Sequence, residues 1–484
     1  MHVSIIIKIL GILLMLFSIL SNLLPVIVSI LYQDGMVGVF FKSFLFVFIT
    51  GLLMWLPTSR SRKELSTRDG FLIVTLFWVV LGTAGCLPFI LSPAVELSFT
   101  DAVFESLSGL TTTGATVISG LDSLPKSILF YRQQLQWLGG MGIIVLAMAL
   151  LPMLGIGGMQ LYRAESPGPV KDNKLVPRLA ETAKALWYIY LTLTVICALA
   201  YWLVGMDLFD AISHSFTTVA IGGFSTHDLS IGFFDNPAVE LVAIIFMFIA
   251  GINFALHFTA WQKRSGSHYA LDPEFIFYTF ILVSVSVVTV AVLYFSSIYT
   301  SLFESTIKGV FQVVSFATTT GFATADFNSW PLFLPYMLLY AAIIGACAGS
   351  TGGGMKVIRI LLIFKQGFRE VQRLIHPRAI IPIKLGHKAV PNRVIESVWG
   401  FFAVYVMAFM VMLLALLATG LDIITAFSAV GACINNLGPG LSGVAETYEH
   451  LPATAKWILC FAMLLGRLEV FTLLVLFTPM FWKR

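Results

Sequence analysis

Four segments of this 484-residue chain end in a short run of small, hydroxyl-bearing or amide-bearing residues that closes with glycine. The closing glycines recur roughly 100 residues apart, which indicates one long repeat rather than a short solenoid period. Backbone carbonyls and threonine hydroxyls in such loops can replace the hydration shell of K⁺, and glycine permits backbone geometry that a Cβ resists. The sequence therefore predicts a potassium-binding ring of four loops. Its residues are Thr111, Thr112, Thr113, Gly114, Ala220, Ile221, Gly222, Gly223, Thr318, Thr319, Thr320, Gly321, Asn435, Asn436, Leu437 and Gly438.

The same segments are alike ahead of the glycine, where each has a small residue six positions earlier and alanine or glycine twelve positions earlier. The stretch before each glycine has about ten to thirteen residues, too short to cross ~30 Å of hydrocarbon but long enough for a half-helix. An acidic residue near its start suits the positive end of the helix dipole, so the negative end is directed at the membrane centre. The four acids are Asp101, Asp210, Glu304 and Asp422.

A second interpretation of these loops needs no ion. Threonine and glycine are common at helix–helix contacts in membranes, and one such run would be weak evidence for a binding site. Irregular backbone at membrane depth occurs only where it is buried or lines a watery path. Four aligned copies in equivalent places therefore favour the ring.

The composition requires a membrane to hold these loops, because 58% of the residues are hydrophobic and only 11% are charged. A soluble surface needs about a quarter of the residues charged. We therefore predict an all-α polytopic protein whose main partner is the lipid bilayer. The net charge of +4 is too small for a nucleic-acid partner. Ten spans are expected, at about 5–31, 37–56, 71–91, 131–154, 185–204, 237–261, 275–295, 331–364, 394–419 and 452–479.

Basic residues gather in alternate loops between these spans. The positive-inside rule places those loops in the cytoplasm, together with both chain termini. The same charges would also suit a docking face for a partner. The groups are Arg60, Arg62, Lys63 and Arg68; Arg163, Lys171, Lys174, Arg178 and Lys184; Lys263 and Arg264; and Lys365, Arg369, Arg373, Arg378, Lys384, Lys388 and Arg393.

The four loops, with the Ala115-Thr116, Phe224-Ser225-Thr226, Phe322-Ala323-Thr324 and Pro439-Gly440 that follow them, resemble the Trk/Ktr/HKT superfamily of potassium transporters. The resemblance covers nearly the whole chain, and the two spans before the first repeat are similar to its bacterial TrkH branch. It implies a pore of four non-identical repeats in pseudo-fourfold arrangement, a homodimer, and a bacterial inner-membrane location. It also implies a cytoplasmic TrkA-like ring that binds NAD or adenine nucleotides, so any nucleotide comes through the partner and no covalent cofactor is expected.

Within this superfamily, glycine at all four loop positions accompanies potassium preference, so the resemblance implies K⁺ as substrate. We expect two extra N-terminal helices at 1–70, followed by repeats at 71–182, 183–272, 273–392 and 393–484. The ring is unequal, because loops two and four depart from the threonine pattern, and the amide oxygens of Asn435 and Asn436 are candidate extra ligands on one side. Fewer ideal sites would make selectivity over Na⁺ modest.

The predicted span 331–364 is interrupted by a run of small residues that disfavours a helix, since each interior glycine costs about 1 kcal/mol. The run resembles the gating loop of the family and would block the pore below the ring; close helix packing is the other interpretation. A phosphate-binding loop is excluded, because Met355 separates Gly354 from Lys356. The gate residues are Gly345, Gly349, Ser350, Thr351, Gly352, Gly353 and Gly354.

Arg467 stands in the middle of the last span, where a cation is costly and usually faces a cavity or a partner. The matching arginine of the family is an electrostatic barrier, which implies that Arg467 faces the pore and belongs to the gate. A structural ion pair with another helix is the alternative. Glu469 is two residues away and does not share its helix face.

Three functions were weighed. The first is a gated potassium-conducting subunit, and the second is a proton- or sodium-coupled symporter. Coupling normally needs a buried titratable group, and no carboxylate is expected beside the ring. The third, an intramembrane enzyme, needs a nucleophile with a base or a metal set, and neither pattern is present. His214 and His257 are expected to pack or to form hydrogen bonds rather than to bind a metal.

Overall fold

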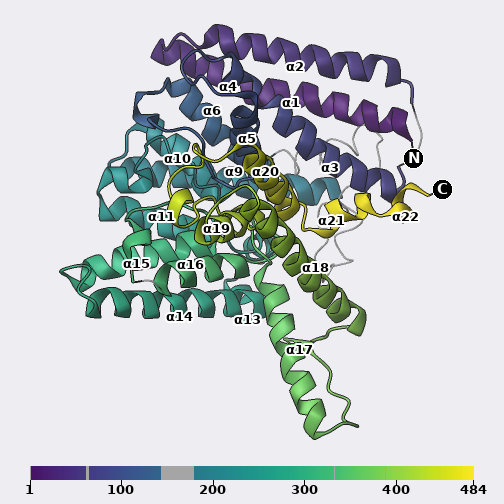
Figure 1. Ribbon diagram of the computed structural model, residues 1–484, viewed down its shortest axis with the longest axis vertical. Coiled ribbons are helices and arrows are strands. Elements are labelled where there is room, and N and C mark those ends of the chain that lie inside the picture. The colour runs from purple at the N-terminus through teal and green to yellow at the C-terminus, as the bar shows by residue number, and fades with distance from the viewer. Residues whose placement is uncertain (1, 62–64, 143–178, 332, 387, 484) are drawn as a thin grey trace.

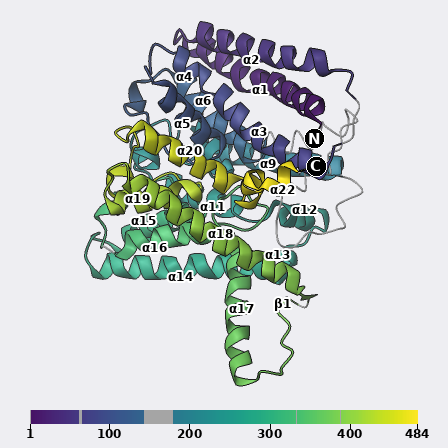
Figure 2. The same cartoon turned by 45° about the vertical axis from the view of Figure 1, so that its right-hand side comes forward.

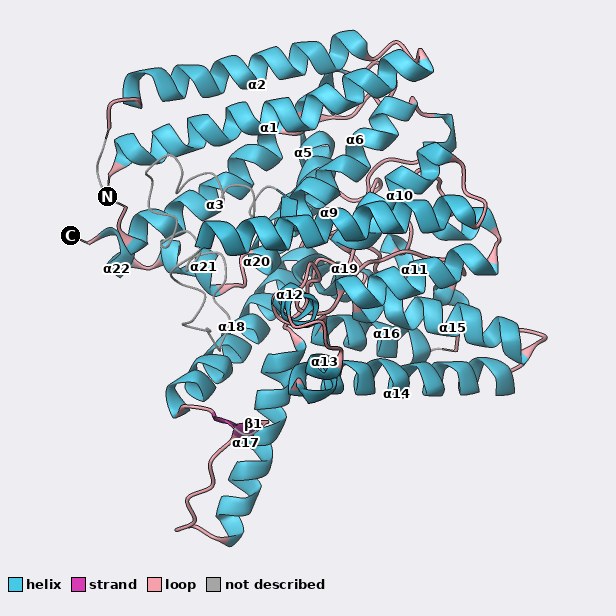
Figure 3. Ribbon diagram, turned by 180° about the vertical axis from the view of Figure 1, so that it is seen from behind, coloured by secondary structure: helices cyan, strands magenta, loops and turns pink. Residues whose placement is uncertain are grey.

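The computed structural model describes residues 2–61, 65–142, 179–331, 333–386 and 388–483, and the structural statements below refer to these ranges. Regular structure in them is helical, apart from the antiparallel two-residue strands β1 (Lys384–Leu385) and β2 (Lys388–Ala389) (Figure 3). Six of the described helices are long and apolar enough to cross a membrane, or eight if two sharply bent pairs each count as one span. The prediction of an all-α polytopic membrane protein is confirmed.

The chain begins with a pair of long helices, α1 (Val3–Tyr32) and α2 (Val37–Thr58), which lie along one edge of the molecule (Figure 1). They approach closely at Gly11 and Gly51, because a Cβ built on either glycine would lie 2.7 Å from the carbonyl oxygen of the other. Small residues allow this close contact between membrane helices.

Four groups of helices follow, and each group has a long helix, a short buried helix and a broken helix. Group one lies beside α1 and α2, group three lies on the opposite side of the molecule, and groups two and four lie on opposite faces (Figures 1 and 3). Group one is α3 (Thr67–Ala84) with α4 (Leu87–Leu91), α5 (Phe99–Leu110) and α6 (Lys126–Trp137). Group two is α9 (Leu179–Leu203), α10 (Leu208–Ala220), and α11 (Pro237–Ala250) with α12 (Phe254–Gln262). Group three is α14 (Pro273–Phe295), α15 (Leu302–Ala317), and α16 (Phe333–Ile344) with α17 (Val357–Ile375), preceded by α13 (Ser267–Leu271). Group four is α18 (Asn392–Leu417), α19 (Ile423–Ile434), and α20 (Ala453–Arg467) with α21 (Phe471–Leu474), followed by α22 (Pro479–Trp482).

The short helices α5, α10, α15 and α19 begin at a serine or aspartate whose side chain accepts a hydrogen bond from a backbone N–H three residues later. This contact satisfies one of the free donors of the first turn. The sequence placed acids at these starts, and the structure refines their roles: Asp422 is itself the cap, whereas Asp101, Asp210 and Glu304 stand in the first turn. The capping residues are Ser98, Asp207, Ser301 and Asp422.

The last helix of each group is interrupted, and only the third interruption was predicted. The helix α6 passes into a π-helical turn at Leu138–Gly142, where the described part of the predicted span 131–154 ends. The chain bends by 88° between α11 and α12 and by 109° between α20 and the 471–477 segment. The predicted span 331–364 is not continuous, because α16 ends at Ile344 and α17 starts at Val357.

The helix α17 projects away from the helical bundle, and both termini lie together at one end of it (Figure 2). Arg68, at the start of α3, donates a hydrogen bond to the carbonyl oxygen of Lys483 at 2.6 Å. The other end of the chain also contacts α3, because the His2 N–H donates to Asp69 at 3.1 Å.

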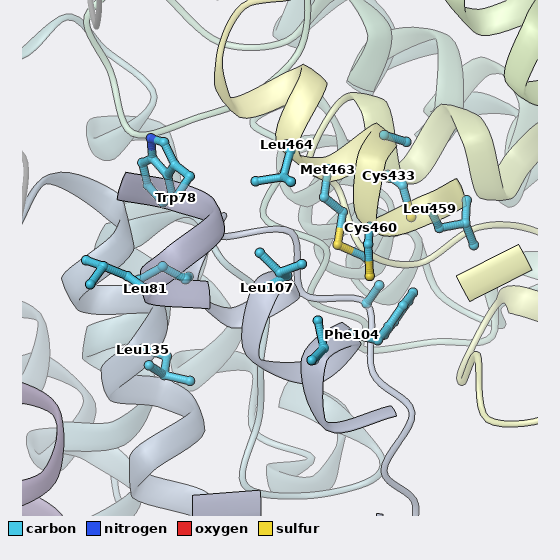
Figure 4. Packing of buried hydrophobic residues seen from close by; sticks show 14 of the residues in the cluster. Trp78, Leu81, Phe104, Leu107, Leu135, Cys433, Leu459, Cys460, Met463 and Leu464 are labelled. Carbon is cyan, nitrogen blue, oxygen red and sulfur yellow. The ribbon is translucent and has the colours of Figure 1, made fainter. Parts of the chain in front are cut away.

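The first short helix lies in a tightly packed apolar core between α3 and α20. Phe104 and Leu107 of α5 point toward Cys460 and Met463 of α20, with Leu81 of α3 on the other side (Figure 4). All five side chains are buried. Packing of this density holds the loop that follows α5 in one place.

Candidate functional site

The four loops that follow the short helices share one backbone conformation. In each loop the closing glycine has a positive φ, and so does the residue two positions before it, although that residue is never glycine. Such angles are rare for residues with a Cβ and persist only where the surroundings impose them. The values are 56° and 82° for Thr112 and Gly114, 54° and 80° for Ile221 and Gly223, 67° and 85° for Thr319 and Gly321, and 52° and 96° for Asn436 and Gly438.

The same backbone hydrogen bond fixes all four loops. The N–H group of the residue before each glycine donates to the carbonyl oxygen five residues earlier, in the last turn of the short helix. The acceptor is the position where the sequence showed a small residue in all four segments. The bonds are Thr113 to Ser108 at 2.8 Å, Gly222 to Thr217 at 2.9 Å, Thr320 to Ser315 at 2.8 Å and Leu437 to Ala432 at 2.8 Å.

The loops meet in a closed ring, and the glycines are the points of contact. A Cβ built on any of the four would collide with the carbonyl oxygen of the residue before the glycine in the next loop. The order runs from loop one to two, three, four and back to one. The distances are 2.2 Å from Gly114 to Gly222, 2.0 Å from Gly223 to Thr320, 2.1 Å from Gly321 to Leu437 and 2.6 Å from Gly438 to Thr113. Glycine is thus required both by its φ angle and by the neighbouring loop.

A buried ion pair lies behind the ring, between loops one and two. Glu105 of α5 accepts from the Thr116 hydroxyl at 3.0 Å and the Val117 N–H at 2.9 Å, just past Gly114. Arg132 of α6 donates to Glu105 at 2.8 Å and to the Ser225 carbonyl in loop two at 3.0 Å. The expectation that no carboxylate lies beside the ring was wrong, since Glu105 is fully buried there.

Sequence reasoning overlooked Glu105 although the repeat alignment contained its signal. Nine residues before the glycine the other loops have His214, Gln312 and Ala429. His214 donates to or accepts from the Ser225 hydroxyl at 2.9 Å, the counterpart of the contact between Glu105 and Thr116. His257 likewise contacts the Ile249 carbonyl at 3.0 Å, so both histidines form the expected hydrogen bonds.

The side chains of Asn435 and Asn436 join loop four to α18, α19, α20 and loop one. The Asn435 amide oxygen accepts from the Tyr405 hydroxyl of α18 at 2.9 Å, and its NH₂ group donates to the Gly431 carbonyl at 2.7 Å. The Asn436 NH₂ group donates to the Thr113 hydroxyl at 2.9 Å and to the Met463 carbonyl at 3.0 Å. That these amide oxygens are extra ligands of the ring stays a prediction, with one lone pair of the Asn435 oxygen already engaged by Tyr405.

The segment from Gly345 to Lys356, here named the intramembrane loop, lies against the ring on the side where the short helices end. The Gly353 N–H donates to the Thr319 hydroxyl at 2.6 Å, and the Gly354 N–H donates to the Asn435 carbonyl at 3.1 Å. The Thr351 hydroxyl donates to the Val219 carbonyl, the last but one residue of α10, at 3.0 Å. The loop thus contacts the inner ends of loops two, three and four.

Glycine is necessary in this intramembrane loop because it passes so close to the ring. A Cβ on Gly353 would lie 1.9 Å from the Asn435 carbonyl oxygen, and one on Gly352 would lie 2.7 Å from that of Thr318. The two interpretations of the small-residue run are therefore compatible, since close packing is what places the loop under the ring. Gly345, Gly349 and Gly354 have positive φ angles. The Ser350 hydroxyl donates to the Cys347 carbonyl at 2.6 Å.

Glu274, at the start of α14, joins the two ends of the intramembrane loop. Its Oε1 accepts from the Ala348 N–H at 2.7 Å and from the Ile358 N–H at 3.2 Å. Its side chain is buried, so this one carboxylate satisfies two backbone donors that would otherwise be buried without a partner. No motif in the sequence marks this residue.

Arg467 contacts loop one of the ring. Its guanidinium donates to the Thr112 hydroxyl at 3.3 Å, and to the carbonyls of Gly139 at 2.5 Å and Gly140 at 2.6 Å in the π-helical turn. It also lies 5.1 Å from the Trp78 ring centroid. Arg467 therefore reaches loop one from the side where α5 ends, and that it faces the pore stays a prediction.

Of the basic residues that the sequence assigned to cytoplasmic loops, Arg62, Lys63, Arg163, Lys171, Lys174 and Arg178 lie outside the described residues. The group from Lys365 to Arg393 lies on α17, on α18 and on the segment between them. Arg369 and Arg373 form ion pairs with Glu370 on the same helix.

Comparison with known proteins relates the entire chain to one family of transport proteins. Residues 37–484 match the TrkH family, which is described as a cation transport protein. Proteins named Trk system potassium uptake protein TrkH are 58% identical in Halomonas elongata and 56% identical in Escherichia coli K12, with 100% of each chain covered. The crystal structure of the potassium transporter TrkH from Vibrio parahaemolyticus superposes with a TM-score of 0.91, at 54% identity and with 100% of both chains covered.

These relatives are transport proteins, in agreement with the expectation that the chain is not an enzyme. The family match, the relatives and the membrane-spanning helices show that this chain belongs to the TrkH family of cation transport proteins.

Proposed function

We propose that this chain is the membrane subunit of a potassium uptake system and that K⁺ crosses the bilayer through the ring of four loops. The observation that carries the proposal is the closed ring, in which four loops of one conformation touch through their glycines. Its relatives are named as potassium uptake proteins. The four helix groups then correspond to four repeats, with boundaries near 71–182, 183–272, 273–392 and 393–484 after the 1–70 pair.

The short helices would favour a cation in the ring. Each ends at a loop of the ring, so the negative ends of four helix dipoles converge on one place. Carbonyl and hydroxyl oxygens there would replace the hydration shell of K⁺. Buried restraints such as the Glu105–Arg132 pair keep the ring from collapsing onto a smaller ion.

The described conformation would be a blocked one. The intramembrane loop contacts loops two, three and four, and Arg467 contacts loop one. Both supply hydrogen-bond donors to oxygens at the inner end of the ring, which a passing ion would otherwise face. We infer that each of the two obstructs K⁺ and that removing either one raises its passage.

The regulation we propose comes from another chain. A cytoplasmic ring that binds NAD or adenine nucleotides would move the intramembrane loop, and the membrane subunit would work as a homodimer in the bacterial inner membrane. The termini lie together at one end of the bundle, which fits the proposal that both are cytoplasmic.

A coupled symporter is the second candidate, and the buried Glu105 is the observation that favours it. A carboxylate beside the ring is a titratable group of the kind that proton coupling needs. Its charge is compensated by the ion pair with Arg132. Flux in proteoliposomes with and without a proton gradient separates the two candidates, since a pore conducts K⁺ down its own gradient alone.

The test of the proposed block is Arg467→Ala, measured as Rb⁺ or K⁺ influx into proteoliposomes. A like charge at 4–6 Å from an ion costs several kcal/mol at an effective dielectric of about 20, so influx should rise by about tenfold or more. The control is Arg373→Ala, which removes the same charge from an exposed position on α17 and should change nothing. Equal influx in Arg467→Ala and the parent, at equal reconstitution, would refute the block.

A further inference from the structure

The intramembrane loop and Arg467 belong to different helix groups, yet one ion pair joins the segments that carry them. Arg359, in the first turn of α17, pairs with Glu469 in the break after α20. Arg359 comes three residues after the intramembrane loop, and Glu469 comes two residues after Arg467. We propose that this pair couples the two obstructions, so that the intramembrane loop and Arg467 are released together.

Arg359 is fixed to the intramembrane loop as well as to Glu469. Its guanidinium donates to the Met355 carbonyl, near the end of the loop, at 3.1 Å. It lies 4.1 Å from the centroid of the Phe401 ring on α18, and its side chain is only 6% exposed. A guanidinium with partners on three sides transmits a displacement of any one of them to the others.

Glu469 lies in a strained segment. Both Glu469 and Val470 have positive φ angles, at 51° and 56°, although neither is glycine. Such angles are unfavourable for residues with a Cβ, so the break persists only because its surroundings impose it. The ion pair with Arg359 is one of these restraints. If α17 moves and withdraws Arg359 from Glu469, the backbone at Glu469 and Val470 can relax. Arg467 is two residues before Glu469, so this relaxation would displace Arg467 as well.

The first turn of α17 is therefore a junction of three elements. Ile358 donates its N–H to Glu274 of α14, and Arg359 pairs with Glu469 of the last span. Arg359 also donates to the Met355 carbonyl of the intramembrane loop. Removing one partner of a buried ion pair leaves an uncompensated charge, which is strongly unfavourable. Moving the intramembrane loop and the segment after α20 together keeps the ion pair intact, so it costs less free energy than moving one of them alone.

The proposal rests on the proposed block of the pore. Its test changes Arg467 and measures how accessible the intramembrane loop becomes. Ser350→Cys places a thiol in the intramembrane loop, and the five native cysteines are buried. The rate at which a methanethiosulfonate reagent modifies this thiol is measured in the purified full chain in detergent, against the chain without the new cysteine. Arg467→Ala should raise the rate about fivefold or more, the lower end of typical coupling between sites.

The link itself is tested by Glu469→Gln, which removes the charge and keeps the side-chain shape. In that background Arg467→Ala should no longer change the modification rate. The matched control is Glu370→Gln at an exposed position on α17, the helix that carries Arg359, and in that background Arg467→Ala should still raise the rate. The reversed pair, Arg359→Glu with Glu469→Arg, should restore the dependence, and it keeps the experiment informative if Glu469→Gln does not fold.

Two outcomes overturn the coupling: no effect of Arg467→Ala on the rate, or an undiminished effect when Glu469→Gln is present. Influx measured on the same variants keeps this separate from the block. Raised influx with an unchanged modification rate refutes the coupling alone, whereas unchanged influx with a raised rate refutes the block and supports the coupling.

Discussion

The ring makes a graded prediction for its glycines, of which Gly223→Ala is the sharpest case. An added Cβ at this position would lie 2.0 Å from the Thr320 carbonyl oxygen of the next loop. The two atoms must separate by about 1 Å or more before they reach ordinary van der Waals contact. The substituted residue must also keep a φ of 80°, which costs about 1–2 kcal/mol for a residue with a Cβ.

The two contributions can be separated with a control inside the same chain. Gly120 has a φ of 71°, and the nearest atom to its built Cβ is 3.7 Å away. Gly120→Ala therefore imposes the backbone strain without the collision. Gly438→Ala is intermediate, because its Cβ would lie 2.6 Å from the Thr113 oxygen.

The assay is influx of K⁺, Rb⁺ and Na⁺ into proteoliposomes, carried out in an Arg467→Ala background so that the pore conducts. We expect Gly223→Ala to lower the ratio of K⁺ to Na⁺ influx by about tenfold, because a displacement of about 1 Å spoils the distances of an ion's ligands. Gly438→Ala should lower the ratio less, and Gly120→Ala should leave it unchanged. An unchanged ratio in Gly223→Ala would refute the assignment of this ring as the place where ions are selected.

Two further predictions concern the outer and inner ends of the pathway. His227, in the loop after Gly223, lies 2.5 Å from Asp122 and 3.1 Å from Asp210; burial lowers its pKa, but these two carboxylates raise it above the ordinary value. A histidine whose pKa is raised in the folded state stabilises the fold fully below pH about 6.5, and progressively less as the pH rises through the raised value. The melting temperature should therefore fall as the pH rises across that window. His227→Gln should make the melting temperature depend less on pH there. Equal pH profiles for the two proteins would contradict this. Glu274→Ala should raise basal K⁺ influx, because it removes two hydrogen bonds to the intramembrane loop, and hydrogen bonds to a charged group contribute about 1.5–3 kcal/mol each. Glu274→Gln should raise influx less, because its amide oxygen still accepts. Influx equal to the parent in both variants would show that the contacts of Glu274 with the intramembrane loop are irrelevant to the block.

Much of this architecture was predictable because the constraint that produces it is local. Glycine is needed wherever φ is positive and a neighbouring backbone is close, so Gly114, Gly223, Gly321 and Gly438 mark their loops even where the flanking residues differ. The position of Asp422 likewise followed from helix capping alone. Short apolar stretches that cannot span a bilayer then imply half-helices, and the structure has them as α5, α10, α15 and α19.

The rest depends on contacts between residues far apart in sequence, which no local pattern marks. Glu274 and Ala348 are 74 residues apart, and Arg359 and Glu469 are 110 apart. The Asn435 amide could be assigned only once Tyr405 of α18 was placed beside it. Glu105 is the exception, because its alignment with His214 and Gln312 was visible in the sequence and pointed to a polar layer behind the ring.

If the described conformation is the blocked one, as we propose, its polar contacts would also explain how a closed pore can be stable without an ion. Buried hydroxyl and carbonyl oxygens at the inner end of the ring would be costly without partners. Arg467 supplies a donor to Thr112, the intramembrane loop supplies N–H donors to Thr319 and Asn435, and Thr351 supplies its hydroxyl to Val219. Opening would remove all of these donors, so water or K⁺ would have to take their places. In the proposed mechanism the intramembrane loop and Arg467 compete with the ion for the same oxygens. A release in which both segments leave together would avoid an intermediate in which some of these oxygens have neither a donor nor an ion.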